Sequence, residues 1–187
     1  MTAAHLPVVG VDLSLTGTGI ATADGVRTIG SSGRKGASLR VRHARLADLA
    51  TQVVLAVSEA AAPRTALVVL EAPAFSRTTG HQHDRSGAWW LLVDELLAAG
   101  HLVAEVAPTC RAKYATGKGN AGKAAVVSAV SHRYGVVFAD DNAADAFVLR
   151  AMGLHRYGQP LASVPKAHAA ALDAVAWPDV DHLAVSA

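Results

Sequence analysis

Mainly apolar runs occur at three places in the chain. Such runs, with little regular alternation of polar and apolar residues, predict strands that are covered on both faces of a sheet. They occupy residues 6–13, 66–70 and 102–106. Two shorter runs, Ile20 to Thr22 and Val26 to Ile29, flank Asp24-Gly25 and predict a hairpin. The chain is therefore expected to begin with three antiparallel strands.

Longer stretches between these runs repeat apolar residues at helical spacing. The first extends from Ser38 to Ala62 and ends before Pro63. Its apolar positions are three or four residues apart, namely Leu46, Leu49, Val53 and Val57. Further helices are expected at residues 88–99, from Pro108 onward, and at residues 123–134, 142–157 and 166–175.

The order of these elements predicts an α/β fold. Three antiparallel strands, followed by two further strands separated by helices, make a mixed central β-sheet flanked by helices. At 187 residues the chain is long enough to bury a core of its own. We expect residues 1–157 to form one domain and residues 158–187 to form a C-terminal extension with one short helix.

Three acidic residues stand inside apolar stretches that are expected to be buried. Asp12 lies in the first strand, Glu71 follows the strand at 66–70, and Asp145 lies in the helix at 142–157. A carboxylate in a dry environment is costly unless a cation or hydrogen-bond donors compensate its charge. Because Mg²⁺ takes oxygen ligands from a few carboxylates, a shared metal ion is the simplest explanation.

A fourth acid, Asp141, lies one helical turn before Asp145 and on the same helix face. Its ordinary explanation is an N-cap, since Asp is favoured immediately before a helix. Alternatively, it completes a carboxylate cluster with the three buried acids. Such a cluster can hold two Mg²⁺ ions roughly 4 Å apart, an arrangement suited to phosphodiester hydrolysis.

The net charge is only +2, but the basic residues are unevenly distributed. Residues 31–47 contain five lysines and arginines and no acid, and residues 106–139 contain five more, again with no acid. Solvated helix faces and loops would explain either segment alone. The two together, in a chain with buried carboxylates, favour a polyanionic partner.

Composition also narrows the cellular setting. No apolar run approaches the roughly 20 residues of a membrane span, so no membrane association is expected. A single cysteine, Cys110, cannot form an internal disulfide. A reducing cytoplasm is therefore the expected location.

Four segments of the chain together match the motifs of one protein family. They are Gly10-Val11-Asp12-Leu13-Ser14-Leu15-Thr16-Gly17-Thr18-Gly19, the strand ending in Glu71, the glycine- and lysine-bearing residues 113–123, and Asp141-Asn142-Ala143-Ala144-Asp145-Ala146. Over about residues 6 to 155 the chain resembles the RuvC-type Holliday junction resolvases, above all the smaller versions carried by bacteriophages. This resemblance implies an RNase H-like fold, which has the order of elements predicted above.

The resemblance also implies an activity and a set of site residues. It implies a Mg²⁺-dependent endonuclease, with Mn²⁺ expected to substitute, that nicks four-way DNA junctions as a homodimer. Asp12, Glu71 and Asp145 would be metal ligands, and Lys123 would lie near the scissile phosphate. The fourth ligand of the family stands three residues before the last Asp, where this chain has Asn142. We favour Asp141 for that role, with Asn142 as the alternative.

Contacts with DNA are expected from three loops. Phe75, followed by Arg77, lies just past Glu71 and resembles an aromatic residue of the family that stacks on a base at the opened junction. Packing of Phe75 onto its own loop is an equally good explanation. Backbone phosphates are expected to be bound by Lys113, Lys118, Arg34 and Lys35.

Other functions and assemblies stay open at this point. The turn at Thr16-Gly17-Thr18-Gly19 also resembles the phosphate-binding turn of sugar kinases and actin-like ATPases, which suggests an ATP-dependent phosphotransferase of that type as an alternative. Asn142 suggests a second alternative, a branched-DNA-binding protein without catalysis. The apolar content of the helix at 88–99 suggests a dimer interface. Preference among four-way junctions, flaps and forks is not encoded in any motif.

Overall fold

A computed structural model describes residues 6–73 and 82–180 of the chain. Its strands are β1 (Val8–Asp12), β2 (Thr18–Ala21), β3 (Val26–Ile29), β4 (Leu67–Glu71) and β5 (Leu102–Val106). They form one sheet in the order β3-β2-β1-β4-β5. β1 to β3 pair antiparallel, whereas β1, β4 and β5 pair parallel. The predicted mixed sheet is therefore confirmed.

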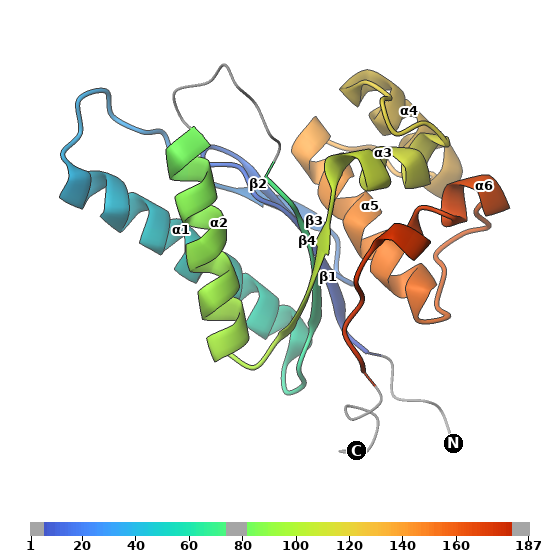
Figure 1. Cartoon of the computed structure of the whole chain (residues 1–187), viewed down its shortest axis with the longest axis horizontal. Coiled ribbons are helices and arrows are strands. Elements are labelled where there is room, and N and C mark those ends of the chain that lie inside the picture. Colours follow the sequence, from blue (N-terminus) through green and yellow to red (C-terminus); the bar gives the residue numbers. More distant parts are fainter. Residues whose placement is uncertain (1–5, 74–81, 181–187) are drawn as a thin grey trace.

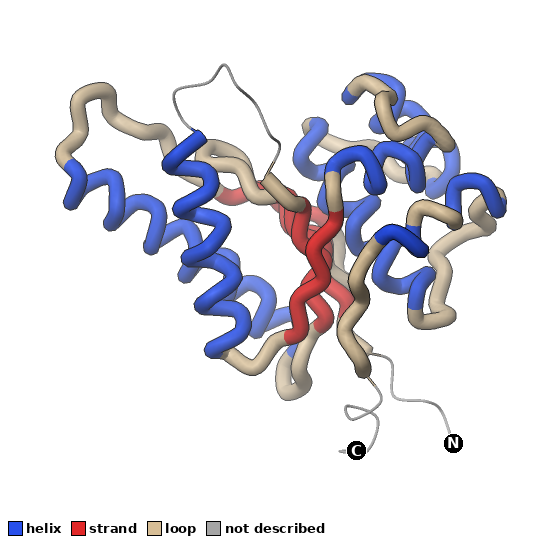
Figure 2. Tube along the Cα trace, viewed as in Figure 1, coloured by secondary structure: helices blue, strands red, loops and turns tan. Residues whose placement is uncertain are grey.

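Helices cover both faces of the sheet, which is seen nearly edge-on in Figures 1 and 2. One face carries α1 (Leu39–Ala61) and α2 (Gln82–Ala98). The other carries α3 (Pro108–Thr116), α4 (Lys123–Tyr134), α5 (Asp141–Arg156) and α6 (Lys166–Ala169), followed by a 3₁₀ turn at Leu172–Ala174. Within the described ranges, no helix combines the length and apolar character needed to cross a bilayer.

Two helices differ from the sequence-based expectation. α2 begins at Gln82, six residues before the predicted start at Ala88. Its first turns are polar and so give no apolar periodicity, but Asp84 in the first turn interacts favourably with the helix dipole. The helix expected at 166–175 is instead α6 followed by the separate 3₁₀ turn.

Side chains of the central strands alternate between two apolar cores. In β1, Val9 and Val11 belong to the core beneath α1 and α2, whereas Val8 belongs to the core beneath α5. β4 divides in the same way. Because side chains alternate along a strand, Asp12 and Glu71 at the strand ends fall on the α5 side of the sheet.

Two glycines allow α5 to lie directly on the sheet. A Cβ atom at Gly10 would be 2.0 Å from the carbonyl oxygen of Ala146, and one at Gly19 would be 2.2 Å from that of Asn142. Either distance is far inside van der Waals contact, so backbone packs on backbone at both places. The N-terminal half of α5 is thereby held against β1 and β2, which places Asp145 close to the end of β1.

Residues after α5 pack onto the same core as the sheet. Leu172 and Val175 are buried in the cluster that contains Val8. The indole Nε1 of Trp177 donates a hydrogen bond to the carbonyl oxygen of Leu172 at 2.9 Å, and the Tyr157 hydroxyl donates to that of Pro178 at 2.6 Å. The C-terminal segment is thus anchored to the body of the molecule by apolar burial and hydrogen bonds.

Candidate active site

A cavity of about 260 Å³ opens where β1 and β4 end. Its lining includes all three acids that the sequence analysis singled out, together with three basic residues and two amides: Asp12, Glu71, Asp145, Arg85, Arg111, Lys123, Gln82 and Asn142. These side chains come from two strands and four helices. The fold therefore brings together residues that are up to 133 positions apart, as a shared site requires.

Asp12 is the least compensated of the three acids. No residue of the described ranges donates a hydrogen bond to its side chain. Burial, followed by repulsion from Glu71 and Asp145, raises the pKa of Asp12 to about 8, although Arg111 and Lys123 oppose the shift. A cation placed beside this carboxylate would relieve that cost.

Arg111 joins the other two acids. Its Nε donates a hydrogen bond to Oε2 of Glu71, and its Nη1 donates to Oδ1 of Asp145. The residue is only 8% exposed. Burial nevertheless raises the pKa of Glu71, and it raises the pKa of Asp145 to about 6, with Arg111 acting in the opposite direction in both cases. One buried arginine therefore only partly neutralises the cluster.

An exposed ion pair lies at the rim of the cavity. Lys123, in the first turn of α4, donates a hydrogen bond through Nζ to Oδ2 of Asp141. This bond lowers the pKa of Asp141 and raises that of Lys123. Asp141 is not among the residues that line the cavity, whereas Lys123 is.

Around the start of α5, the structure shows which residue is the N-cap and which residue faces the cavity. Asp140 is the N-cap, because its side chain accepts a hydrogen bond from the backbone N–H of Ala143 at 2.7 Å. The N-cap interpretation of Asp141 is therefore wrong by one residue. Asn142 lines the cavity, and its Nδ2 donates to the carbonyl oxygen of Gly17 at 2.6 Å. The choice of Asp141 or Asn142 as a metal ligand stays a prediction.

The chemistry of the donor set suits a hard divalent cation. Carboxylate oxygens dominate it, and Asp12 retains uncompensated negative charge. Among residues 6–73 and 82–180, however, no three His, Cys, Asp or Glu side chains are already grouped as a metal site. The Arg111 guanidinium lies between Glu71 and Asp145, so these two acids are at present grouped around an arginine.

The expected DNA contacts lie in different parts of the surface. Lys113 is exposed on α3, and Lys118 is exposed in the loop that begins at Gly117, whose φ of 81° ends α3 in the left-handed region. Arg34 and Lys35 are exposed in the loop before α1. Phe75 and Arg77 fall outside the described residues.

The sequence analysis missed Arg111 as a site residue. A signal for it was present, because Arg111 shares a helix face with Tyr114 and Ala115, which are buried. A cation on the apolar face of a helix needs an anionic partner, just as a carboxylate in a buried strand needs a cation. The same argument that found the acids would therefore have found the arginine.

The helix expected at a dimer interface is only partly available at the surface. Leu92 and Leu96 are fully buried against the sheet, whereas Trp90 and Leu97 are 66% and 56% exposed. Trp89 packs inward, and its Nε1 donates to the backbone oxygen of Glu71 at 2.9 Å. Trp89 thus steadies the end of β4, and Trp90 remains the main candidate for an intermolecular contact.

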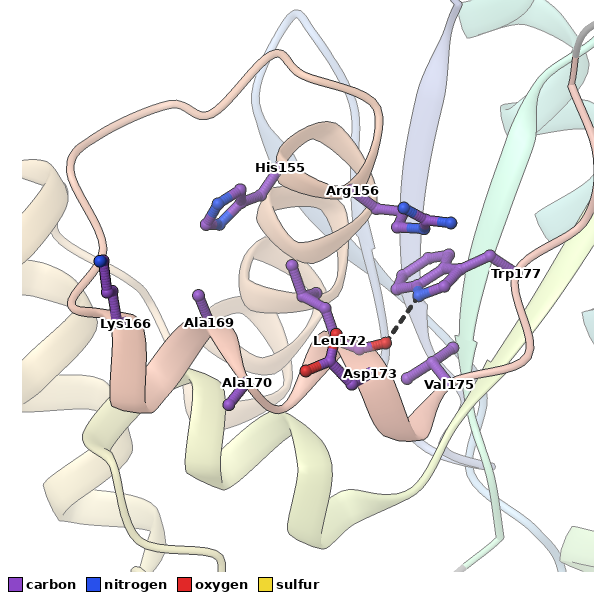
Figure 3. A pocket seen from close by; sticks show the side chains of 9 residues that line it. All are labelled: His155, Arg156, Lys166, Ala169, Ala170, Leu172, Asp173, Val175 and Trp177. Atoms are coloured by element: carbon purple, nitrogen blue, oxygen red, sulfur yellow. Dashed lines mark hydrogen bonds between the residues drawn. The ribbon is translucent and has the colours of Figure 1, made fainter.

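A larger cavity, of about 640 Å³, lies at the opposite end of α5 (Figure 3). His155, Arg156, Lys166 and Trp177 are among the residues that line it. None of the residues predicted for the site lies there. The larger cavity is therefore separate from the carboxylate cluster.

Comparison with known proteins gives matches in structure but not in sequence. No family model matches the chain, and the search of curated proteins finds no match. Among solved structures, RuvC from Thermus thermophilus matches with a TM-score of 0.59 and 20% identity, covering 86% of this chain and 100% of that one. RuvC of T. thermophilus in complex with a Holliday junction substrate matches with a TM-score of 0.57 and 19% identity, with the same coverage.

A third match is more distant. The yeast mitochondrial Holliday junction resolvase Ydc2 gives a TM-score of 0.52 at 13% identity, covering 89% of this chain and 80% of that one. The three TM-scores indicate a common fold, which in this chain is the mixed five-stranded sheet with helices on both faces that was described above. The chain therefore has the α/β fold of the RuvC-type Holliday junction resolvases, which is RNase H-like, as the sequence analysis predicted.

Proposed function

We propose that this chain is a divalent-metal-dependent endonuclease that nicks four-way DNA junctions by two-metal phosphodiester hydrolysis. The observation that carries the proposal is the convergence of Asp12, Glu71 and Asp145 in one cavity of a RuvC-type fold. A solved structure of T. thermophilus RuvC contains a Holliday junction substrate, which supports a branched DNA as the substrate class.

The three acids would hold the metal, together with Asp141 or Asn142. When bound, Mg²⁺ would lower the pKa of water and neutralise charge that develops on the phosphate, and Mn²⁺ is expected to substitute for it. The chain itself orients these ligands: α5 is held on the sheet at Gly10, Arg111 fixes two of the carboxylates, and Trp89 steadies the end of β4.

Lys123 is the basic residue best placed to act on the scissile phosphate. Its side chain is 72% exposed, it lines the cavity, and its partner Asp141 is itself at the rim. An ammonium group there would stabilise the negative charge that accumulates on the phosphate in the transition state. Asp141 would keep Lys123 pointed at the cavity until DNA arrives.

Binding of DNA would depend on the exposed basic residues and on symmetry. We propose that Lys113, Lys118, Arg34 and Lys35 contact backbone phosphates, with Phe75 and Arg77 at the opened junction. A homodimer would present two identical sites related by a two-fold axis, matching the symmetry of a four-way junction.

We also propose that the protein acts in the cytoplasm of a bacterial cell or phage-infected host, as a phage-type resolvase.

The proposal is tested by cleavage of a panel of synthetic DNAs: a four-way junction, a flap, a fork and a linear duplex, each with Mg²⁺ or Mn²⁺. We expect paired nicks in the four-way junction. Asp12→Asn should abolish cleavage but preserve junction binding in a gel-shift assay, and the distant exposed variant Asp94→Asn should cut like the wild type.

Two results would contradict the proposal. Junction binding without cleavage under either metal would leave a non-catalytic branched-DNA-binding protein. Hydrolysis of ATP without junction cleavage would favour a phosphotransferase. The turn that suggested the latter is closed on itself, because the Thr18 hydroxyl donates to the carbonyl oxygen of Ser14 at 2.7 Å and accepts from the Ser14 N–H at 3.2 Å.

A further inference from the structure

The three buried carboxylates of the cavity outnumber the buried cation that is bonded to them in the described structure. Asp12, Glu71 and Asp145 supply the carboxylates, and Arg111 is hydrogen-bonded to Glu71 and Asp145. We call these four residues the buried cluster; the partly exposed Arg85 also lines the cavity. Lys123 is already paired with Asp141. With the three carboxylates ionised, the buried cluster has a net charge of −2, which a single divalent ion would cancel.

Arg111 is built into this cluster and is not a surface residue folded over it. Its side chain is 10% exposed, and those of Glu71 and Asp145 are 13% and 5% exposed. The helix that carries it is fixed to α5, because Tyr114 is fully buried and its hydroxyl donates to the carbonyl oxygen of Ala151 at 3.3 Å. Two carboxylates bind two different nitrogens of the guanidinium, which gives the contact a defined orientation.

We propose that Arg111 takes the place of one divalent ion in the DNA-free protein, so that the resting site binds a single divalent ion per chain instead of two. This inference rests on the proposed function, because it assumes that the carboxylates hold metal. Arg111 is then a positioning residue: it keeps Glu71 and Asp145 ionised and in place, and it lowers the attraction of the cluster for a second dication.

The test is calorimetric titration of Mn²⁺ into DNA-free protein. The wild type should bind one ion per chain. Arg111→Met, which keeps the bulk of the side chain but removes the charge, should bind two ions, or one ion at least about tenfold more tightly. Arg111→Lys should still bind one ion, because it retains the charge. Arg42→Met breaks an ion pair with Asp84, and neither residue lines the cavity; this variant is the matched control and should bind like the wild type.

Loss of folding does not remove the test. If Arg111→Met is unfolded without metal, Mn²⁺ should restore its circular dichroism spectrum. A divalent ion should then compensate the charge of Glu71 and Asp145, as Arg111 does in the wild type. Failure of Mn²⁺ to fold this variant would overturn the inference. So would two ions of similar affinity in the wild type, or an unchanged count and affinity in a folded Arg111→Met.

Failure of the inference differs from failure of the proposed function. If the wild type cuts junctions but binds two ions without DNA, only the proposed role of Arg111 is refuted. If the wild type neither binds Mn²⁺ nor cuts junctions, both the role of Arg111 and the proposed nuclease function are refuted.

Discussion

Among the residues of the candidate site, Asp12 is the one that destabilises the folded state most when it is ionised. It is buried close to two other carboxylates, and the arginine of the cluster is bonded to those two and not to Asp12. A protein that needs this group for metal binding must tolerate its repulsion whenever the metal is absent. The metal-free protein should therefore be less stable than its core alone would allow.

This cost predicts a pH-dependent stability. Burial, followed by repulsion from Glu71 and Asp145, raises the pKa of Asp12 from its ordinary value of 3.8 to about 8 in the folded protein. Between these values the folded state binds a proton that the unfolded state does not, so stability falls as pH rises from about 4 to about 8. Asp12→Asn should raise the melting temperature in EDTA by roughly 5 °C at pH 8, and by less at pH 5.

Thermal unfolding of both proteins across this pH range measures the effect. Asp94→Asn, on the exposed side of α2, is the control and should follow the wild type. Equal shifts at pH 5 and pH 8, or a destabilised Asp12→Asn, would show that Asp12 is not under electrostatic stress.

Among the elements, α5 has the most direct influence on the site. It carries Asp145 and Asn142, and it is seated on the sheet through Gly10 and Gly19 without intervening side chains. A helix packed through side chains can shift by repacking them. A helix packed through its backbone has no such freedom, so a single added methyl group must displace it or distort the strand.

Gly10→Ala should therefore destabilise the protein by about 3 kcal/mol or more, since overpacking of a tight contact is costly. Activity should fall further than stability explains, because Asp145 moves away from Asp12. Gly87→Ala adds the same methyl group in α2, where the nearest atom is 3.8 Å away. This control should be neutral or stabilising by up to about 1 kcal/mol.

Urea denaturation and junction cleavage, measured on both variants, separate the two effects. A Gly10→Ala protein with wild-type stability would mean that α5 is not seated as described. One that is destabilised but fully active under folding conditions would mean that the seat of α5 does not set the geometry of the site.

At the scale of the whole molecule, the C-terminal segment shares its core with the sheet. Leu172 is 8% exposed and lies in the same apolar cluster as Leu67 of β4. Residues 158–187 were predicted as an extension of a domain that ends at 157. The packing indicates that this extension and the sheet should unfold together.

Leu172→Ala should lower the free energy of unfolding of the whole protein by about 2–4 kcal/mol, the usual cost of emptying a buried leucine site. Leu161→Ala, at a residue that is 43% exposed, should change it by less than about 1 kcal/mol. Tryptophan fluorescence and circular dichroism should report one transition in both variants. Separate transitions, or a Leu172→Ala protein as stable as the wild type, would show an independent extension.

The sequence was most informative where local pattern and tertiary environment agree. The buried strands and α1, α4 and α5 were predicted to within about two residues, because apolar periodicity and caps such as Ser38 define them locally. The start of α2 was missed because its first turns are polar. Three metal-site candidates were found because carboxylates are rare in apolar runs, whereas the contact between Arg111 and two acids depends on tertiary packing between α3 and α5.

The close packing of α5 on Gly10 also affects which parts of the sequence can change during evolution. Because peptide groups, and not side chains, set the distance between β1 and α5, mutations that replace core residues leave that distance unchanged. Most core residues can then be substituted over time, while the two glycines keep the distance between the acids constant. We therefore expect the spacing of the acids in this chain to tolerate many core substitutions, as long as Gly10 and Gly19 are kept.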